Sequence, residues 1–334
     1  MSSTLQACLP ITWPRSTLDA AGLLALADLP TAAYRTALTG TSCLLDMFVL
    51  CPGLHKQQRA ADLHKCEYPA CAAMTSGYVF RVENPAMVFF MQRVGLTGHL
   101  TTLAVSPQNQ PGSSWWRCGF IATFNVGATT SIPALTYGLA VVLTPLTMSF
   151  LFLRQECWAL TFLLLLILVR AINVLVIRAR ATEGWKGARE KGNSDILILL
   201  SQDRWLRLKG AVNDVKAVTS GQWLRESTFI ESSLVTGATL LVYFDVCLAA
   251  NATLEGKVVL IALLVCSAAL LETANEYNSS LTMYGRVVKV EGKPKLYARR
   301  LVMAEELIKE TGRRDWAEGL GMVNADVRKG LPIM

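Results

Sequence analysis

Residues Cys157–Ile177 read CWALTFLLLLILVRAINVLVI, an apolar run whose only charged side chain is Arg170. A helix needs ~20 predominantly apolar residues to cross the hydrocarbon core of a bilayer, so this run predicts a transmembrane helix. Three further stretches have the same character: Leu135–Leu153, Phe229–Ala250 and Val258–Ala274. The sequence therefore predicts an all-α membrane protein with four transmembrane helices.

Two short links, Arg154-Gln155-Glu156 and Asn251–Lys257, join these helices into two hairpins. Each link carries one basic residue, whereas the segment 178–226 carries ten and the tail after Glu276 carries eleven. Because basic residues concentrate on the cytoplasmic side of a membrane, both of these segments and the N-terminus are predicted to be cytosolic. The net charge of +7 has the same explanation, so it indicates no nucleic-acid partner.

The rest of the chain divides by composition. Met1–Gly40 lacks the basic and apolar regions of a signal peptide, so we expect the first membrane helix to direct insertion. A natural start at Met74 or Met87 is an alternative. The predicted parts are a poorly organised N-terminal cytosolic region (1–117), an interfacial or re-entrant segment (118–133), a four-helix membrane domain (134–276) that includes a cytosolic segment (178–227), and a cytosolic tail (277–334).

Two amphipathic helices are expected outside the membrane. In the cytosolic segment, apolar or small side chains recur at helical spacing from Trp205 through Leu208, Val212 and Val215 to Thr219. In the tail, a similar pattern covers residues 295–311 and ends before Gly312. Such helices lie on a membrane surface or pack against one another.

Ionisable residues inside membrane helices are costly and mark candidate sites. Counted along the helices, Arg170 and Glu272 fall at one depth, so we expect them to pair, either to fix helix packing or to serve a substrate or a proton. Asp245 lies near the outer end of its helix, where we expect it to be solvated. The polar neighbours of the expected pair are Asn173, Glu231 and Asn275.

Other chemistry has little support. The cluster Cys51, His55, His64, Cys66 and Cys71 matches no common zinc spacing, so we expect no metal. No glycine-rich phosphate loop or nucleophile motif occurs, and we expect no cofactor. The glycosylation sequons at Asn251 and Asn278 are expected to stay unused, the first being too near the membrane and the second cytosolic.

Three short stretches carry a resemblance: RQECW at 154–158, SQDRW at 201–205 and KAVTSGQWL at 216–224. Together they resemble uncharacterised multi-pass integral membrane proteins of filamentous fungi, over roughly residues 118–322. The resemblance implies an endomembrane (endoplasmic reticulum) or plasma-membrane setting, and it transfers no catalytic residues.

Three functions stay open. The first is a non-enzymatic accessory, scaffold or lipid-interacting component, whose partners are membrane lipids and other membrane proteins. The second is a membrane-embedded enzyme with acid chemistry of the cyclase or isomerase kind on an apolar lipid or terpenoid-like molecule, with Glu272, Glu276 or Asp245 as the acid. The third is a small transporter or channel that uses Arg170 and Glu272. The sequence does not decide whether the protein is an enzyme.

Overall fold

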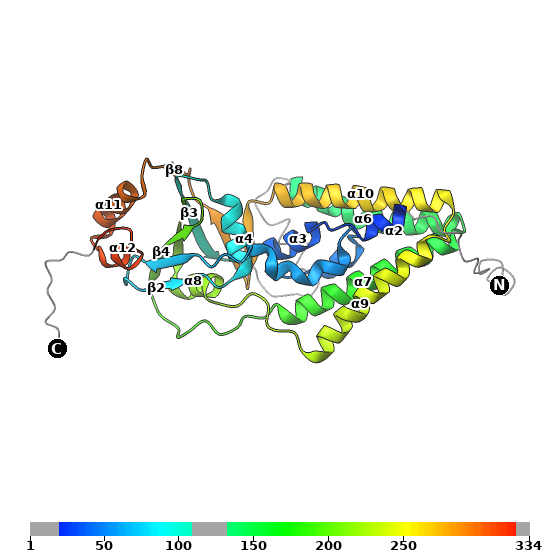
Figure 1. The fold of residues 1–334 in the computed structure, drawn as a ribbon, viewed down its shortest axis with the longest axis horizontal. Helices are drawn as coiled ribbons and strands as arrows, with labels where there is room; N and C mark the ends of the chain where they lie inside the picture. Colours follow the sequence, from blue (N-terminus) through cyan, green and yellow to red (C-terminus); the bar gives the residue numbers. More distant parts are fainter. Residues whose placement is uncertain (1–19, 109–131, 325–334) are drawn as a thin grey trace. The chain divides into compact units, whose positions relative to one another are not determined.

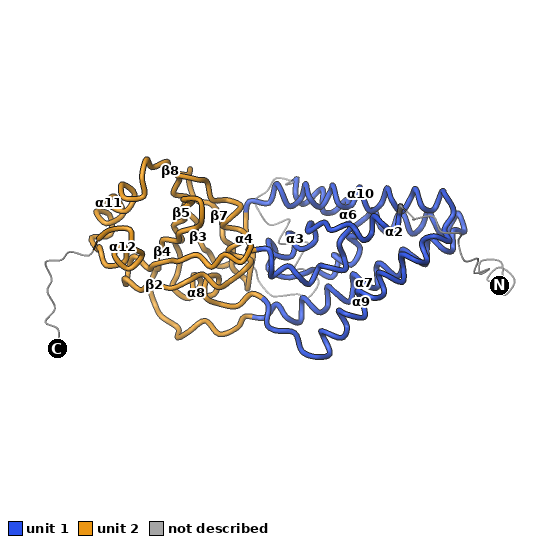
Figure 2. Tube along the Cα trace, in the orientation of Figure 1, with its two compact units in different colours: residues 1–63, 110–182, 224–279 blue, residues 64–109, 183–223, 280–334 orange. Residues whose placement is uncertain are grey.

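The computed structural model describes residues 20–108 and 132–324 (Figure 1). The chain forms two compact units (Figure 2), which we call the helical unit (1–63, 110–182 and 224–279) and the sheet unit (64–109, 183–223 and 280–334). The predicted re-entrant segment 118–133 lies outside the described residues except for Ile132 and Pro133, which begin a long apolar helix.

The helical unit contains the four expected helices, each long and apolar enough to cross a membrane. Their 21 to 24 residues correspond to about 32–36 Å of helix. This part of the sequence prediction is confirmed at the level of length and composition. The helices are α6 (Ile132–Leu153), α7 (Cys157–Arg180), α9 (Phe229–Ala249) and α10 (Leu254–Glu276).

Local chemistry defines the two hairpins. Gln155 adopts a left-handed conformation (φ 59°), which reverses the chain between α6 and α7 within three residues. Thr253 caps α10 by accepting a hydrogen bond from the Gly256 N–H at 3.2 Å. The guanidinium of Arg154 donates to both carboxylate oxygens of Glu255, at 3.0 and 2.7 Å, so the two turns lie together at one end of the unit.

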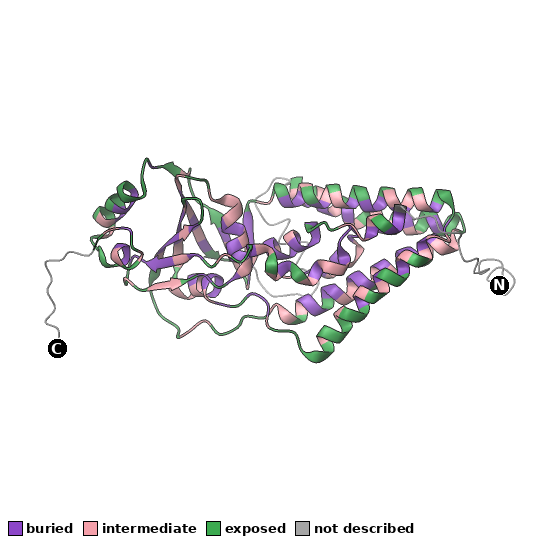
Figure 3. Cartoon of the chain, viewed as in Figure 1, coloured by how far each residue is buried: buried purple, intermediate pink, exposed green. Residues whose placement is uncertain are grey.

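The helices pair across the hairpins: α6 packs along α10, and α7 packs along α9. Their outer faces are exposed and carry large apolar side chains (Figure 3). Leu146 and Leu240, for example, keep 61% and 62% of their surface accessible. A continuous apolar surface of this kind suits contact with lipid rather than with water.

An N-terminal segment, residues 20–63, lies among these helices, and we call it the inserted segment (blue in Figure 1). It contacts all four of them, α2 and α3 packing on α10, α2 on α9, and η1 on α6 and α7. Within the expected N-terminal region 1–117, the described residues form short helices and strands. Its elements are α2 (Ala20–Ala25), α3 (Thr31–Thr39) and the 3-10 helices η1 (Leu44–Phe48) and η2 (Leu54–His64).

The sheet unit contains an eight-stranded mixed sheet, so the all-α prediction holds only for the membrane helices. The strand order is β2-β1-β4-β5-β3-β7-β6, and β8 pairs with β3. Only β3 and β5 are parallel; the other pairs are antiparallel. The strands are β1 (Ala70–Ala73), β2 (Val79–Arg81), β3 (His99–Pro107), β4 (Asn193–Leu200), β5 (Arg204–Ala211), β6 (Ser280–Met283), β7 (Arg286–Val290) and β8 (Lys295–Leu296).

The amphipathic helix expected from Trp205 to Thr219 is wrong in its first half. Residues 204–211 form β5, and only α8 (Val212–Thr219) is helical. The strand is central in the sheet, and Trp205–Leu208 are all buried. The alternation of apolar and polar residues that marks a half-exposed strand is therefore missing, and the apolar residues that remain can be fitted to a helical period. Gln202 and Asp203, with φ of 62° and 50°, form the tight turn that starts this strand.

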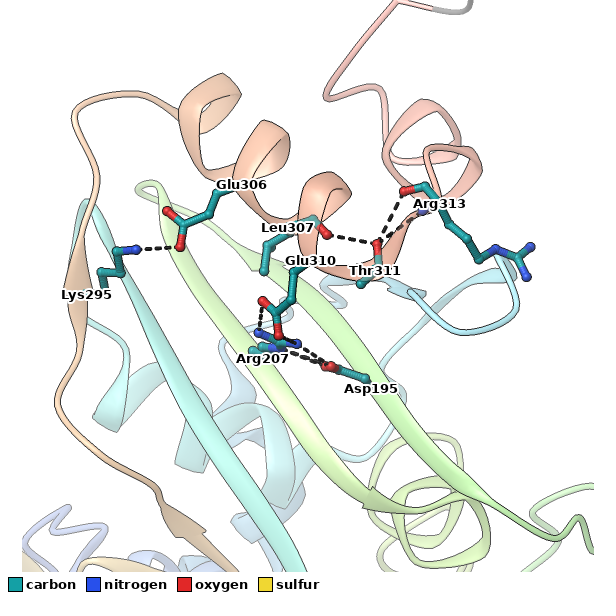
Figure 4. A network of polar contacts seen from close by, with 8 residues as sticks. All are labelled: Asp195, Arg207, Lys295, Glu306, Leu307, Glu310, Thr311 and Arg313. Atoms are coloured by element: carbon teal, nitrogen blue, oxygen red, sulfur yellow. Dashed lines mark hydrogen bonds and ion pairs between the residues drawn. The ribbon is translucent and has the colours of Figure 1, made fainter.

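In the tail, α11 (Arg300–Thr311) confirms the second part of the expected helix 295–311, and Gly312 ends it in a left-handed conformation. An ion network attaches this helix to the sheet (Figure 4). The guanidinium of Arg207 on β5 reaches the carboxylates of Asp195 (2.6 Å) and Glu310 (2.7 Å). The Arg207 hydrogen bond lowers the pKa of Glu310. Two further helices, α4 (Pro85–Val94) and α12 (Asp315–Gly319), complete the described part of the unit.

Candidate functional site

The polar interior of the helical unit centres on Asp46 in η1. Its carboxylate accepts hydrogen bonds from the Tyr137 hydroxyl on α6 (2.6 Å) and from the Cys43 N–H (2.7 Å). Asp46 is 4% exposed and Tyr137 is fully buried. A buried carboxylate is expensive unless donors surround it, so these two bonds allow the charge to stay inside.

Two arginines approach the same point. Arg170 on α7 is 1% exposed and donates from Nε to the backbone carbonyl of Asp46 at 2.8 Å. The Arg35 guanidinium lies 4.4 Å from the centre of the Tyr137 ring, a cation–π contact. Opposite charges therefore accompany Asp46 inside the helical unit, although Arg170 Nη1 itself has no acceptor in the described part of the chain.

Other membrane-helix side chains donate to the backbone of the inserted segment in the same way. The donors lie on α7 and α10, and their acceptors are the Ser42 carbonyl in the link between α3 and η1 and the carbonyls of the first residues of α3 and η2. The bonds run from Asn173 to the Leu54 carbonyl (3.3 Å), from Arg178 to Ser42 (3.2 Å) and from Asn275 to Thr31 (3.0 Å). The Thr239 hydroxyl on α9 donates to the Val235 carbonyl of its own helix at 3.0 Å and lies 3.4 Å from the His55 carbonyl.

The expected pair of Arg170 with Glu272 does not form. Glu272 lies on the exposed side of α10, between the buried residues Leu271 and Asn275. Glu276, the last residue of α10, is also exposed. Depth along a helix can be counted from the sequence, whereas the direction of a side chain around the helix depends on its packing partners. The acceptor that Arg170 uses is a backbone carbonyl, which no sequence pattern marks.

Glu231, another expected neighbour of Arg170, caps its own helix. It forms a capping box with Thr228, whose backbone N–H donates to the Glu231 carboxylate at 2.9 Å. Its carboxylate also accepts from Arg225 at 2.9 Å. Glu231 therefore belongs to the start of α9 and not to the interior cluster.

Asp245 differs from the expectation in another respect. It lies four residues before Ala249, the last residue of α9, near the turns, as predicted, but it is fully buried instead of solvated. It shares the buried face of α9 with Ala238, Val242 and Ala249. Within residues 20–108 and 132–324, neither carboxylate oxygen of Asp245 has a hydrogen-bond partner. Asp245 is thus the one acid of the three sequence candidates that lies in the interior.

The cysteine and histidine cluster is dispersed among different environments. Cys51 is buried in the apolar core of the helical unit, and His55 lies 6.1 Å from the Tyr243 ring. In the sheet unit, His64 packs on Tyr68, Cys66 is exposed, and burial raises the pKa of the Cys71 thiol. Among the residues that the structure describes, no three His, Cys, Asp or Glu side chains could hold a metal ion together.

The two sequon asparagines lie in the links before and after α10. The amide nitrogen of Asn251 donates to the Leu248 carbonyl at 3.3 Å within the short turn, and the sequon hydroxyl of Thr253 caps α10. Asn278 follows α10 in the link to β6. Whether either is glycosylated stays a prediction.

Sequence reasoning missed the residues at the centre of the site, Asp46, Tyr137 and Arg35. One signal was present: Asp46 is the only charged residue in the otherwise apolar stretch 44–50. Comparison with known proteins adds no assignment, since no family model, no curated protein and no solved structure matches the chain.

Proposed function

We propose that the protein is a non-enzymatic accessory or scaffold component of a membrane. In this proposal the helical unit inserts into the bilayer with both hairpin turns on the outer side. The sheet unit lies outside the lipid and offers the surface that binds other membrane proteins. The endoplasmic reticulum and the plasma membrane are the two settings that fit.

One observation carries the proposal: the interior polar side chains of the helices bind the protein's own backbone. Arg170, Asn173 and Asn275 each donate to a carbonyl of the inserted segment. The donor atoms used in these bonds hold the inserted segment in place and are not free for a substrate, whereas Arg170 Nη1 takes no part in them and has no acceptor among the described residues. The transport hypothesis loses support for a related reason, because Arg170 and Glu272 do not meet.

A second candidate function rests on a separate observation. Asp245 is buried without a hydrogen-bond donor, and a carboxyl group in an apolar interior suits acid chemistry on an apolar molecule. The enzyme hypothesis is therefore kept for Asp245 alone.

Complementation separates the two candidates. Cells that lack the protein and show a growth or morphology defect receive either the wild-type chain or the Asp245→Asn variant, which keeps shape and removes the acid. The scaffold proposal expects full rescue by Asp245→Asn, and it expects both proteins to run in the same larger assembly on native gels. Loss of rescue with the assembly unchanged would instead support acid chemistry. Migration of the wild-type chain as a monomer would contradict the scaffold proposal.

A further inference from the structure

A small pocket of about 140 Å³ opens in the inserted segment, between the start of α3 and η2. Ala32 and Ala33 of the first turn of α3 line one side, and Lys56, Gln57 and Arg59 of η2 line the other. A water molecule occupies about 30 Å³ in the liquid, so the pocket has room for several waters or for one group of the size of a phosphate.

Gln57 is the least expected residue in this pocket. Its side chain is 1% exposed, and neither its amide nitrogen nor its amide oxygen has a hydrogen-bond partner among the residues that the structure describes. Leaving both ends of a buried amide unpaired costs several kcal/mol in general, and native proteins rarely tolerate it. Since Gln57 lines the pocket, a polar ligand there would supply the missing partner.

The start of α3 adds backbone donors. The helix has nine residues and no side-chain cap, because Pro30 stands at the N-cap position. The Ala33 N–H has no acceptor within the described part of the chain. A helix start with unpaired N–H groups and the positive end of the helix dipole attracts an anion.

The charged side chains around the pocket also favour an anion. Lys56 forms an ion pair with Asp28 at 2.6 Å, and Arg59 is exposed and makes no hydrogen bond to the described residues. Two cations and one carboxylate leave a net positive charge around the pocket. Arginine matches the geometry of a phosphate particularly well, since its planar group donates two parallel hydrogen bonds.

The position of the pocket along the membrane helices indicates where such an anion would come from. Thr31, the first residue of α3, accepts a hydrogen bond from Asn275, the penultimate residue of α10. The 23 residues of α10 correspond to about 34 Å, against ~30 Å for the hydrocarbon core. The end of α10 opposite the turns, and the pocket beside it, therefore fall at the depth of lipid headgroups.

We propose that the pocket between α3 and η2 binds a phosphate group, held by the Gln57 amide, the Ala33 N–H and the cations Lys56 and Arg59. A phospholipid headgroup and a soluble phosphate share this chemistry. The inference goes beyond the scaffold proposal: it rests on the insertion of the helical unit into a membrane, which that proposal includes, and not on the scaffold role itself.

The test uses the purified full-length chain in detergent, titrated with dioctanoyl phosphatidic acid, with inorganic phosphate and with dioctanoyl phosphatidylcholine, and followed by calorimetry. Arg59→Gln removes an exposed cation and should not disturb folding. Gln57→Glu keeps the side-chain size and places a negative charge in the pocket. Arg189→Gln is the matched control, because Arg189 is an exposed arginine of the sheet unit without a hydrogen bond to the described residues.

We expect phosphatidic acid to bind, and Arg59→Gln and Gln57→Glu each to weaken its Kd by about tenfold or more, as loss of a charge-assisted hydrogen bond would. Arg189→Gln should leave the Kd unchanged. Binding of phosphatidic acid without inorganic phosphate identifies a lipid ligand, and binding of both identifies a general phosphate site. Absence of binding by either probe, or binding that Arg59→Gln leaves unchanged, would overturn the proposal.

Discussion

The Tyr137→Phe variant tests how the helices hold the inserted segment. The substitution removes one hydroxyl group and keeps the buried ring, so it leaves the Arg35 cation–π contact in place. What disappears is the 2.6 Å bond from Tyr137 to the Asp46 carboxylate. The Cys43 N–H then remains as the only hydrogen-bond donor to this carboxylate within the described part of the chain.

The expected cost follows from the kind of bond. A hydrogen bond to a charged group contributes about 1.5–3 kcal/mol, and leaving a buried acceptor unpaired costs a similar amount. We take about 2 kcal/mol for Tyr137→Phe. Since 1.4 kcal/mol is a factor of ten in an equilibrium constant, the inserted segment should open about 30-fold more often.

Labelling of Cys51 measures this opening. Its thiol is 1% exposed, so maleimide reacts only when the segment leaves the core. Mass spectrometry of peptides separates Cys51 from exposed thiols such as Cys66, whose labelling should not change. Tyr277→Phe is the matched control, because Tyr277 is 59% exposed. A Cys51 labelling rate in Tyr137→Phe within about threefold of the wild-type rate would refute the reasoning.

Three other substitutions have defined outcomes. Gly256→Ala places a methyl group 2.9 Å from the Ala159 Cβ and should lower the free energy of unfolding in detergent by about 1–3 kcal/mol, whereas Gly237→Ala, which meets no atom within 4 Å, should leave it unchanged or slightly higher. Arg207→Met leaves two carboxylates without their cation and should destabilise the sheet unit by about 3 kcal/mol in denaturant titrations followed by tryptophan fluorescence; an equally stable variant would contradict this. The Arg207 hydrogen bond holds the pKa of Glu310 below its ordinary value of 4.5. The ionised carboxylate therefore stabilises the folded state above pH 4.5, and this contribution disappears as the pH falls through the lowered pKa. Glu310→Gln should lose less stability than the wild type in thermal melts taken from about pH 5 towards about pH 3.

The four membrane helices could be predicted because each is a long apolar run with short links. The same reasoning placed Asp245 near the turns correctly. The same reasoning did not predict that Asp245 is buried or that Glu272 is exposed, because the direction of a side chain around a helix depends on the elements that pack against that helix. Leu271 and Asn275 face the interior of the helical unit, and Glu272, between them, does not.

The inserted segment and the sheet could not be predicted for a different reason. Residues 44–64 are mostly 3-10 helix, which has neither the period of an α-helix nor that of a strand. The carbonyls that Arg170 and Asn173 bind are backbone groups, which carry no sequence signal. The sheet joins short strands from three distant parts of the chain, and burial on both faces hides the alternation in β5.

The central claim is that residues 20–63 are part of the helical unit and pack among its four long helices. The most direct measurement is cross-linking of Thr31→Cys to Asn275→Cys with a short bifunctional thiol reagent, in native membranes and with the full-length chain. The Asn275 amide lies 3.0 Å from the Thr31 carbonyl, so the account predicts a linked peptide pair at high yield. No linked pair, together with rapid labelling of Thr31→Cys by a membrane-impermeant reagent from the cytosolic side, would contradict it.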